Sequence, residues 1–289
     1  MSRYGLVLTA ATMVAAMTLT ACASEVTGTP AAGPTTAATA TTTTEPAAGG
    51  PPERRIAQRG ECVAGNDPAP VDCAKPHTVE ITMAGSFGGA MPDEPPSRDA
   101  VFEAVFPTCR AEAAKYLGDE RYDMTTLAAW LLWAGADDWK AGARWYRCGV
   151  ARLGPDGRAV SQTGSVKDAL VGNGINDFRL CTKEPPSKAL PAPVACDQPH
   201  RSEAVAVITM GDPRQPLPAA EEFERTARTE CGDALRRYLA AARDDITVAW
   251  HLPDKLNWRH GFNNLTCYAE TKQPVTATLR DIGTAPLPN

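Results

Sequence analysis

The order of apolar and polar positions separates a polar N-terminal part from a folded part that begins near residue 60. Residues 78–84 and 204–210 are apolar and β-branched, which is typical of β-strands, and a loop rich in Pro and Gly follows each. In the second half, apolar residues then recur every three or four positions and so share one helical face. The residues on this face are Phe223, Ala227, Cys231, Leu235 and Tyr238.

The first half holds a matching helical segment, with Phe102, Cys109, Ala113 and Tyr116 on the equivalent face. Pro107 lies inside it and predicts a kink or a restart of that helix. Each half then ends in a strand pattern that contains its last cysteine. These closing strands are expected over residues 144–153 and 263–271. Strands around one main helix favour a small α+β domain with a short antiparallel sheet.

The two halves repeat one another in order. Both contain four cysteines, a Cys-x2-Pro-His-x2-Glu motif and a Trp-x2-Gly-x5-Cys ending, and the upstream Trp130 and Trp250 correspond within one residue. We therefore expect two tandem copies of one domain. The length of each copy is normal for a domain with a single hydrophobic core. The copies span residues 60–153 and 178–272, with a linker at 154–177 and a C-terminal tail at 273–289.

The extreme N-terminus has the features of a secretory signal. Residues 1–21 carry one charge, Arg3, and then an apolar run that is too short to span a bilayer and ends in small residues. Residues 19–22, Leu-Thr-Ala-Cys, resemble the bacterial lipobox. The resemblance implies that Cys22 becomes the N-terminus and carries a diacylglyceryl lipid, which would anchor the protein at the outer face of the cytoplasmic membrane. An ordinary cleaved signal followed by a cysteine is the alternative.

Residues 22–59 consist mainly of Ala, Thr, Pro, Gly and Glu, a composition typical of a disordered tether. As a flexible coil it would hold the first copy on the order of 35 Å from the anchor. Its Thr/Pro-rich stretches are also suited to O-glycosylation. Removing Arg3 with the signal takes the formal net charge from −5 to −6, which gives no electrostatic reason to bind nucleic acid.

Apart from Cys22, eight cysteines remain. An even number in an exported chain is typical of a disulfide framework, and the closely spaced Cys-x2-Cys pairs of zinc sites are missing from the sequence. Four cysteines per copy allow three pairings. We favour a short link at the start of each copy and a longer link from helix to closing strand. The favoured pairs are Cys62–Cys73, Cys109–Cys148, Cys181–Cys196 and Cys231–Cys267.

These motifs resemble those of the actinobacterial septum formation family. Its members combine a Gly-x-Cys start, a Cys-x2-Pro-His motif followed by an acidic residue, a cysteine within the helix and a Trp…Gly…Cys ending. Both copies match, except that Arg179 and Leu180 precede Cys181 where the first copy has Gly60 and Glu61 before Cys62. The resemblance implies a role near cell division or wall synthesis, but no defined chemistry.

Motifs that would identify an enzyme are missing from the sequence, including phosphate loops, Ser-x-x-Lys and His-Glu-x-x-His. The best acid–base candidates are His77 with Glu80 and His200 with Glu203. On a regular strand, residues three apart point to opposite faces. We therefore expect a structural role, in which each histidine bonds a neighbouring backbone group after the Pro turn.

The tryptophans are expected mainly in the core, although some are available to line a groove for a peptide or glycan. Trp139, in the turn formed with Asp137 and Asp138, is the strongest candidate for an exposed binding residue, and Trp258 is its equivalent.

Together these features predict a non-enzymatic, lipid-anchored surface protein with two disulfide-stapled α+β domains on a tether. Its expected partner is an envelope protein or glycan, and no cofactor or metal is expected. Two alternatives stay open: an envelope hydrolase that uses one of the His–Glu pairs, and a thiol-redox protein with exchangeable cysteines.

Overall fold

The computed structural model describes residues 55–89, 93–188, 191–251 and 253–288. The signal segment, Cys22 and the linker up to residue 54 lie outside this range, so their predictions stay predictions. In the part of the chain that is described, no helix has the length and apolar character needed to cross a membrane.

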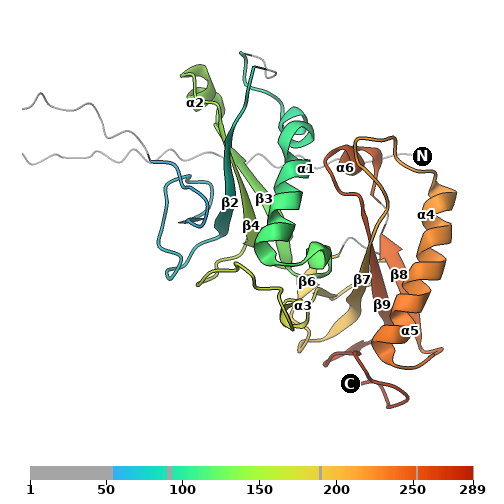
Figure 1. Ribbon diagram of the computed structural model, residues 1–289. Helices are drawn as coiled ribbons and strands as arrows, with labels where there is room; N and C mark the ends of the chain where they lie inside the picture. Colours follow the sequence, from blue (N-terminus) through green and yellow to red (C-terminus); the bar gives the residue numbers. More distant parts are fainter. Residues whose placement is uncertain (1–54, 90–92, 189–190, 252, 289) are drawn as a thin grey trace, which may run out of the picture. The chain divides into compact units, whose positions relative to one another are not determined.

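The first copy is a four-stranded antiparallel sheet with one long helix packed against it (Figure 1). The order across the sheet is β1-β2-β4-β3. The strands are β1 (Cys62–Val63), β2 (Val79–Ser86), β4 (Trp145–Arg152) and β3 (Leu127–Trp133). The helix is α1 (Arg98–Leu117), followed by the 3-10 turn η1 (Glu120–Met124), and α2 (Ala136–Lys140) joins β3 to β4.

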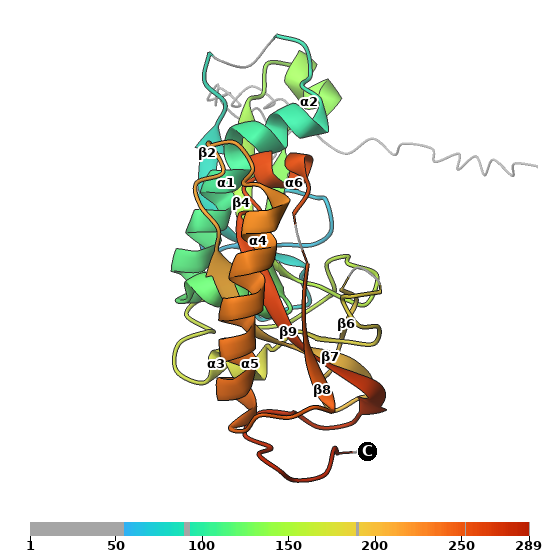
Figure 2. The same cartoon turned by 90° about the vertical axis from the view of Figure 1, so that its right-hand side faces the viewer.

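The second copy has the same strand order with one strand added, β6-β5-β7-β9-β8. The strands are β6 (Pro193–Val194), β5 (Cys181–Thr182), β7 (His200–Thr209), β9 (Asn264–Val275) and β8 (Ile246–His251). Its main helix consists of α4 (Ala220–Thr226), the π-helical segment η2 (Ala227–Cys231) and α5 (Gly232–Leu239), which follow one another as one rod (Figure 2). The short helices α3 (Gly174–Asp177) and α6 (Lys255–Arg259) complete the fold. The predicted α+β class with tandem copies is confirmed.

Pro107 does not interrupt α1, so the predicted kink or restart is wrong. The helix runs from a cap at Ser97, whose Oγ accepts a hydrogen bond from the Ala100 amide at 3.2 Å, to Gly118 at φ 86°. An internal proline removes one backbone donor, but Val105, Phe106 and Cys109 on either side are buried in the core and stabilise the helix by packing. The irregular turn lies instead in the proline-free helix of the second copy, at η2.

Strands β3 and β8 were missed in the sequence. In β3, apolar residues do not alternate with polar ones, because both faces of this strand are covered. Leu127, Ala129 and Leu131 belong to the core beneath α1, whereas Leu132 belongs to a separate cluster on the other face, with Trp130 packed against it.

The segments after both closing strands are part of the folded copies rather than a free linker and tail. Val166, Leu170 and Ile175 are buried in the core of the first copy. Val275 and Leu279 are fully buried in the second. The domain boundaries expected from the sequence were therefore too short at their C-terminal ends. The tether expected over residues 22–59 was too long, because Ala57 is fully buried against β1 and β2 of the first copy.

Four disulfides close the two copies, in the pairing that the sequence favoured. Cys62–Cys73 and Cys181–Cys196 staple the start of each copy. Cys109–Cys148 and Cys231–Cys267 join each main helix to its closing strand, and all four of these sulfur-bearing residues are fully buried.

The two copies pack together through a shared core. Phe106 on α1 meets Phe262 of the second copy with ring centroids 5.5 Å apart. Asn264 Nδ2 donates to Asp123 Oδ2 at 2.6 Å across the same boundary. Ala204 and Tyr268 of the second copy are buried in the cluster that contains α1.

Gly261 is the point of closest approach between the second copy and α1. Its φ is 88°, and a Cβ there would lie 2.9 Å from Pro107 Cα. Its repeat equivalent, Gly142, has φ 93° with open space around it. Alanine at either position incurs left-handed strain of about 1–2 kcal/mol, but only Gly261→Ala also pushes against the backbone of α1.

We therefore expect Gly261→Ala to lower the free energy of unfolding by at least about 1 kcal/mol more than Gly142→Ala. Denaturant unfolding of the two variants measures this difference. Equal losses would mean that the close approach to Pro107 does not contribute to stability.

Candidate functional site

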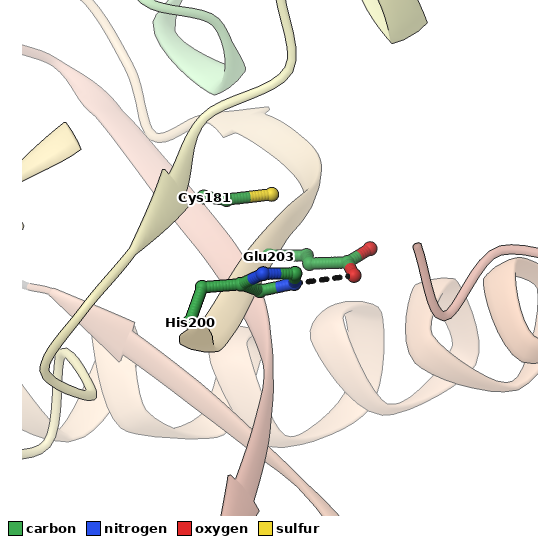
Figure 3. Close-up of side chains that lie close together, drawn as sticks. All are labelled: Cys181, His200 and Glu203. Atoms are coloured by element: carbon green, nitrogen blue, oxygen red, sulfur yellow. Dashed lines mark hydrogen bonds and ion pairs between the residues drawn. The ribbon is translucent and has the colours of Figure 1, made fainter. Parts of the chain in front are cut away.

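His200 and Glu203 form a fully buried pair at the start of β7 (Figure 3). His200 Nε2 lies 2.9 Å from Glu203 Oε1. The expectation that these side chains point to opposite faces is wrong for this copy. The pairing of β7 with β9 shifts register between His200 and Ser202, and such a bulge breaks the regular alternation of side chains.

The Glu203 carboxylate has four hydrogen-bond partners. Besides His200, it accepts hydrogen bonds from Tyr238 Oη at 2.5 Å, from the Leu279 amide at 2.8 Å and from Thr278 Oγ1 at 3.2 Å. A buried carboxylate is costly unless it is paired and hydrogen-bonded. These donors remove that cost, and they tie α5 and the C-terminal segment to β7.

The first copy repeats this arrangement. Glu80, 1% exposed, accepts hydrogen bonds from Tyr116 Oη at 2.6 Å, Ser165 Oγ at 2.6 Å and the Val166 amide at 2.7 Å. We call each glutamate with its tyrosine, hydroxyl and amide donors a carboxylate clasp. The clasp joins the first long strand, the main helix and the segment after the closing strand.

The histidines differ between the copies. In both, Nδ1 lies within hydrogen-bond distance of a backbone carbonyl two residues earlier, at Lys75 or Gln198. This agrees with the predicted backbone role. Nε2 of His77, however, makes no hydrogen bond within the described residues, whereas Nε2 of His200 meets Glu203.

The clasp segments carry a sequence signal that was overlooked. Residues 165–168 read Ser-Val-Lys-Asp, and residues 278–281 read Thr-Leu-Arg-Asp. Asp168 and Asp281 both adopt φ 56°, and their amides donate to the carbonyls of Tyr116 and Tyr238. The internal repeat therefore extends beyond the last cysteine of each copy.

The clasp tyrosines are held as hydrogen-bond donors. Burial, together with the hydrogen bond and charge of Glu80, raises the pKa of Tyr116 far above its usual value. Burial and the charge of Glu203 do the same to the pKa of Tyr238. An arginine lies over each ring, with Arg59 5.5 Å from the Tyr116 centroid and Arg179 4.7 Å from that of Tyr238, but burial and the glutamates outweigh the lowering of the pKa by these charges. Both hydroxyls therefore stay protonated at physiological pH.

His200 is suited to the imidazolium form, because both of its ring nitrogens face oxygen acceptors. Burial is the largest influence and lowers its pKa, but the hydrogen bonds to Glu203 and Gln198 and the charge of Glu203 outweigh burial, so the pKa is raised overall. A histidine whose pKa is raised by folding stabilises the folded protein. This stabilisation is complete when the pH is below the pKa of the unfolded chain, about 6.5, and it is lost as the pH rises through the pKa of the folded protein.

We therefore expect the free energy of unfolding to fall as pH increases from 6 to 9 in the wild type, and to fall less in His200→Gln. Urea unfolding across this pH range, with His77→Gln as the matched variant in the other copy, measures the difference. Parallel profiles for the wild type and His200→Gln would contradict the expectation.

Cys181, His200 and Glu203 place ligand-type atoms within 4.8 Å of one another (Figure 3). A zinc site would need a free thiolate from the cysteine. The Cys181 sulfur is bonded to that of Cys196, and the Glu203 carboxylate is already engaged by its donors. With the disulfide intact, this cluster does not provide a metal-binding set.

Trp139 and Trp258 are buried, at 1% and 2% exposure, so the predicted exposed binding role is wrong for both. Their indole Nε1 atoms donate to the carbonyls of Asp93 at 3.0 Å and Gln215 at 2.7 Å. Both tryptophans thus bond the backbone a few residues before the main helix of their copy. Asp137 and Asp138 beside Trp139 are exposed.

A cavity of about 900 Å³ lies along β3 and is lined by three other tryptophans, Trp130, Trp133 and Trp145. We call this cavity the β3 groove. Phe102 and Phe106 of α1 and Phe262 of the second copy also line it. The histidines and glutamates of the two His-x2-Glu motifs do not line it.

Comparison with known proteins identifies one family. The sequence model described as "Septum formation" matches residues 21–131 and again residues 120–267. Two proteins from different strains of Mycobacterium tuberculosis, each named an uncharacterized membrane protein, are 30% identical over 109 residues. The match covers 36% of this chain and 23% of each of those proteins, so the chain corresponds to less than a quarter of their length. No solved structure matches.

Proposed function

Because the chain belongs to the septum formation family, we propose that it is a cell-envelope protein that binds a partner rather than catalysing a reaction. A lipid on Cys22 would hold it at the outer face of the cytoplasmic membrane, with residues 23–54 as the tether. The membrane assignment draws support from the M. tuberculosis relatives, which are named membrane proteins.

One observation carries the choice of binding over catalysis. Both copies of the His-x2-Glu motif lie inside the fold at 0–1% exposure, with their carboxylates engaged by tyrosine, hydroxyl and amide donors. An acid–base catalyst must come within hydrogen-bond reach of its substrate. The β3 groove is an open, concave part of the described molecule that none of these four residues lines, and its aromatic lining is typical of binding sites.

The anchoring proposal is tested by the position of an export-competent fluorescent fusion in growing cells, compared with Cys22→Ala. We expect a membrane-bound signal that the substitution releases. Enrichment at division sites would support a role in septum or wall assembly, and a uniform outline would support an envelope role without it. An intracellular signal, or a membrane signal unaffected by Cys22→Ala, would overturn the lipid anchor.

The non-enzymatic proposal is tested with the double variant His77→Gln/His200→Gln. A folded, correctly oxidised double variant should complement a deletion strain as the wild type does. Failure to complement, despite normal folding and position, would favour the envelope hydrolase.

A further inference from the structure

Strand β3 is an open edge of the first sheet. In the order β1-β2-β4-β3 it has β4 on one side and, among the described strands, none on the other. The Ala134 amide donates to the Trp145 carbonyl, and the Leu153 amide donates to the Thr126 carbonyl. Between these two hydrogen bonds, the register of β3 with β4 is unbroken. Antiparallel pairs alternate between bonded and non-bonded residues, so the odd-numbered residues of β3 direct their amides and carbonyls away from β4.

These outward groups form a short ladder. Within the described residues, the backbone amides and carbonyls of Ala129, Leu131 and Trp133 have no hydrogen-bond partner outside the sheet. Just before β3, Thr125 forms an antiparallel bridge with Arg179 of the second copy. The backbone of the second copy thus occupies the start of this edge, and the rest of β3 is left unpaired.

β3 lacks the features by which natural edge strands avoid pairing. Its sequence, Leu-Ala-Ala-Trp-Leu-Leu-Trp, contains no charge, proline or glycine, and its register with β4 has no bulge. The opposite edges, β1 and β6, have only two residues each. The equivalent edge β8 carries exposed Thr247 and His251. β3 is therefore the best template for an added strand among the described edges.

The shape of the β3 groove fits such a strand. The groove is lined by side chains from both faces of β3: Phe102, Phe106 and Phe262 pack with the core beneath α1, whereas Leu132 and Trp130 belong to the cluster on the other face. Side chains of an added strand alternate between the two faces of the sheet. They would enter both sides of the groove, while the backbone completes the ladder of β3.

The rim of the groove favours an acidic partner. Arg98 is exposed, lies 4.8 Å from the Phe102 ring centroid, and makes no ion pair within the described residues. Phe102 in turn meets Trp133 with centroids 6.1 Å apart, which puts Arg98 near the end of β3. The other lining cation, Arg110, is neutralised by Asp123 at 2.5 Å.

We propose that the β3 groove binds an extended segment of a partner protein by strand addition to β3. The segment has about six residues without proline, apolar side chains on both faces, and an acidic residue opposite Arg98. This proposal rests on the proposed binding function and names its site and ligand class. The repeating backbone ladder selects a peptide over a glycan.

The probe is a displayed library of random linear heptapeptides, panned against the purified, oxidised full chain. The enriched peptides are then synthesised and titrated. Ala129→Pro removes one backbone N–H that points away from β4. Ala129→Val introduces a side chain similar in size to proline and retains that N–H. We expect affinity to be at least about tenfold lower for Ala129→Pro than for Ala129→Val, because both enlarge the same buried side chain and only the proline loses the amide. Arg98→Gln should weaken binding of acidic peptides selectively.

A second measurement does not depend on the folding of any variant. N-methylation of alternate amides in the best peptide should abolish binding in one register and spare it in the other. Failure to enrich peptides, equal binding to Ala129→Pro and Ala129→Val, or indifference to N-methylation would overturn the proposal. Dimerisation of the wild type that Ala129→Pro abolishes would assign the edge to a second copy instead.

Envelope position separates the two proposals. Ala129→Pro should leave the Cys22-dependent membrane signal unchanged. If peptide binding fails while the fusion still sits at the membrane, strand addition is wrong and the envelope location stands.

Discussion

Glu203→Ala lowers the free energy of unfolding by about 3–5 kcal/mol, the cost of breaking a buried hydrogen-bonded charge pair. The substitution leaves the Tyr238 hydroxyl, the Leu279 amide and the His200 ring without their shared acceptor inside the fold. Glu80→Ala removes the equivalent acceptor in the first copy, but no histidine nitrogen loses its partner there. We therefore expect the larger loss at Glu203.

Denaturant unfolding measures both losses, with Glu221→Ala as the control because Glu221 is an exposed glutamate on α4. The control should change stability by less than about 0.5 kcal/mol. If Glu203→Ala behaves like Glu221→Ala, the clasp is not a stabilising element.

Removal of the helix-to-strand disulfide of the first copy is the second large effect. The Cys109–Cys148 link closes a separation of 39 residues, against 11 for Cys62–Cys73. In the chain-entropy account, the longer loop is worth about 4 kcal/mol and the shorter about 3. Cys109 and Cys148 are also fully buried, so Cys109→Ala/Cys148→Ala leaves a cavity in the core as well.

The double variant Cys62→Ala/Cys73→Ala is the matched comparison, and mass spectrometry verifies that the other three links remain formed. We expect the larger destabilisation from the Cys109/Cys148 variant. A larger loss from the Cys62/Cys73 variant would contradict this order. Free thiols in the oxidised wild type would revive the thiol-redox alternative.

The sequence predicted the features that depend on spacing along the chain. The tandem repeat and the α+β class follow from motifs that recur at fixed intervals, such as Cys73–His77 against Cys196–His200. The disulfide pairing was one of three choices per copy, chosen so that a short link staples the start of each copy and a longer link ties its helix to its closing strand. Such features need only local periodicity and chain order.

Features that depend on tertiary contacts could not be predicted in this way. The bulge that brings His200 onto Glu203 is set by pairing with β9, and the clasp donors Ser165 and Thr278 come from segments that looked like a linker and a tail. The two aspartates before Trp139 predict an exposed turn, yet the Trp139 ring is buried and its indole N–H donates to the Asp93 carbonyl. The β3 groove is formed by both copies, so neither copy's sequence contains it alone.

The His-x2-Glu motif of both copies is closed inside the fold. Diethyl pyrocarbonate acylates accessible imidazoles, and the chain has four histidines. His251 is exposed, whereas His77, His200 and His260 are 1%, 0% and 7% exposed. We predict that native protein is modified rapidly at His251, and at His77 and His200 only after unfolding. Rapid modification of His77 or His200 in the folded, oxidised protein would contradict the account.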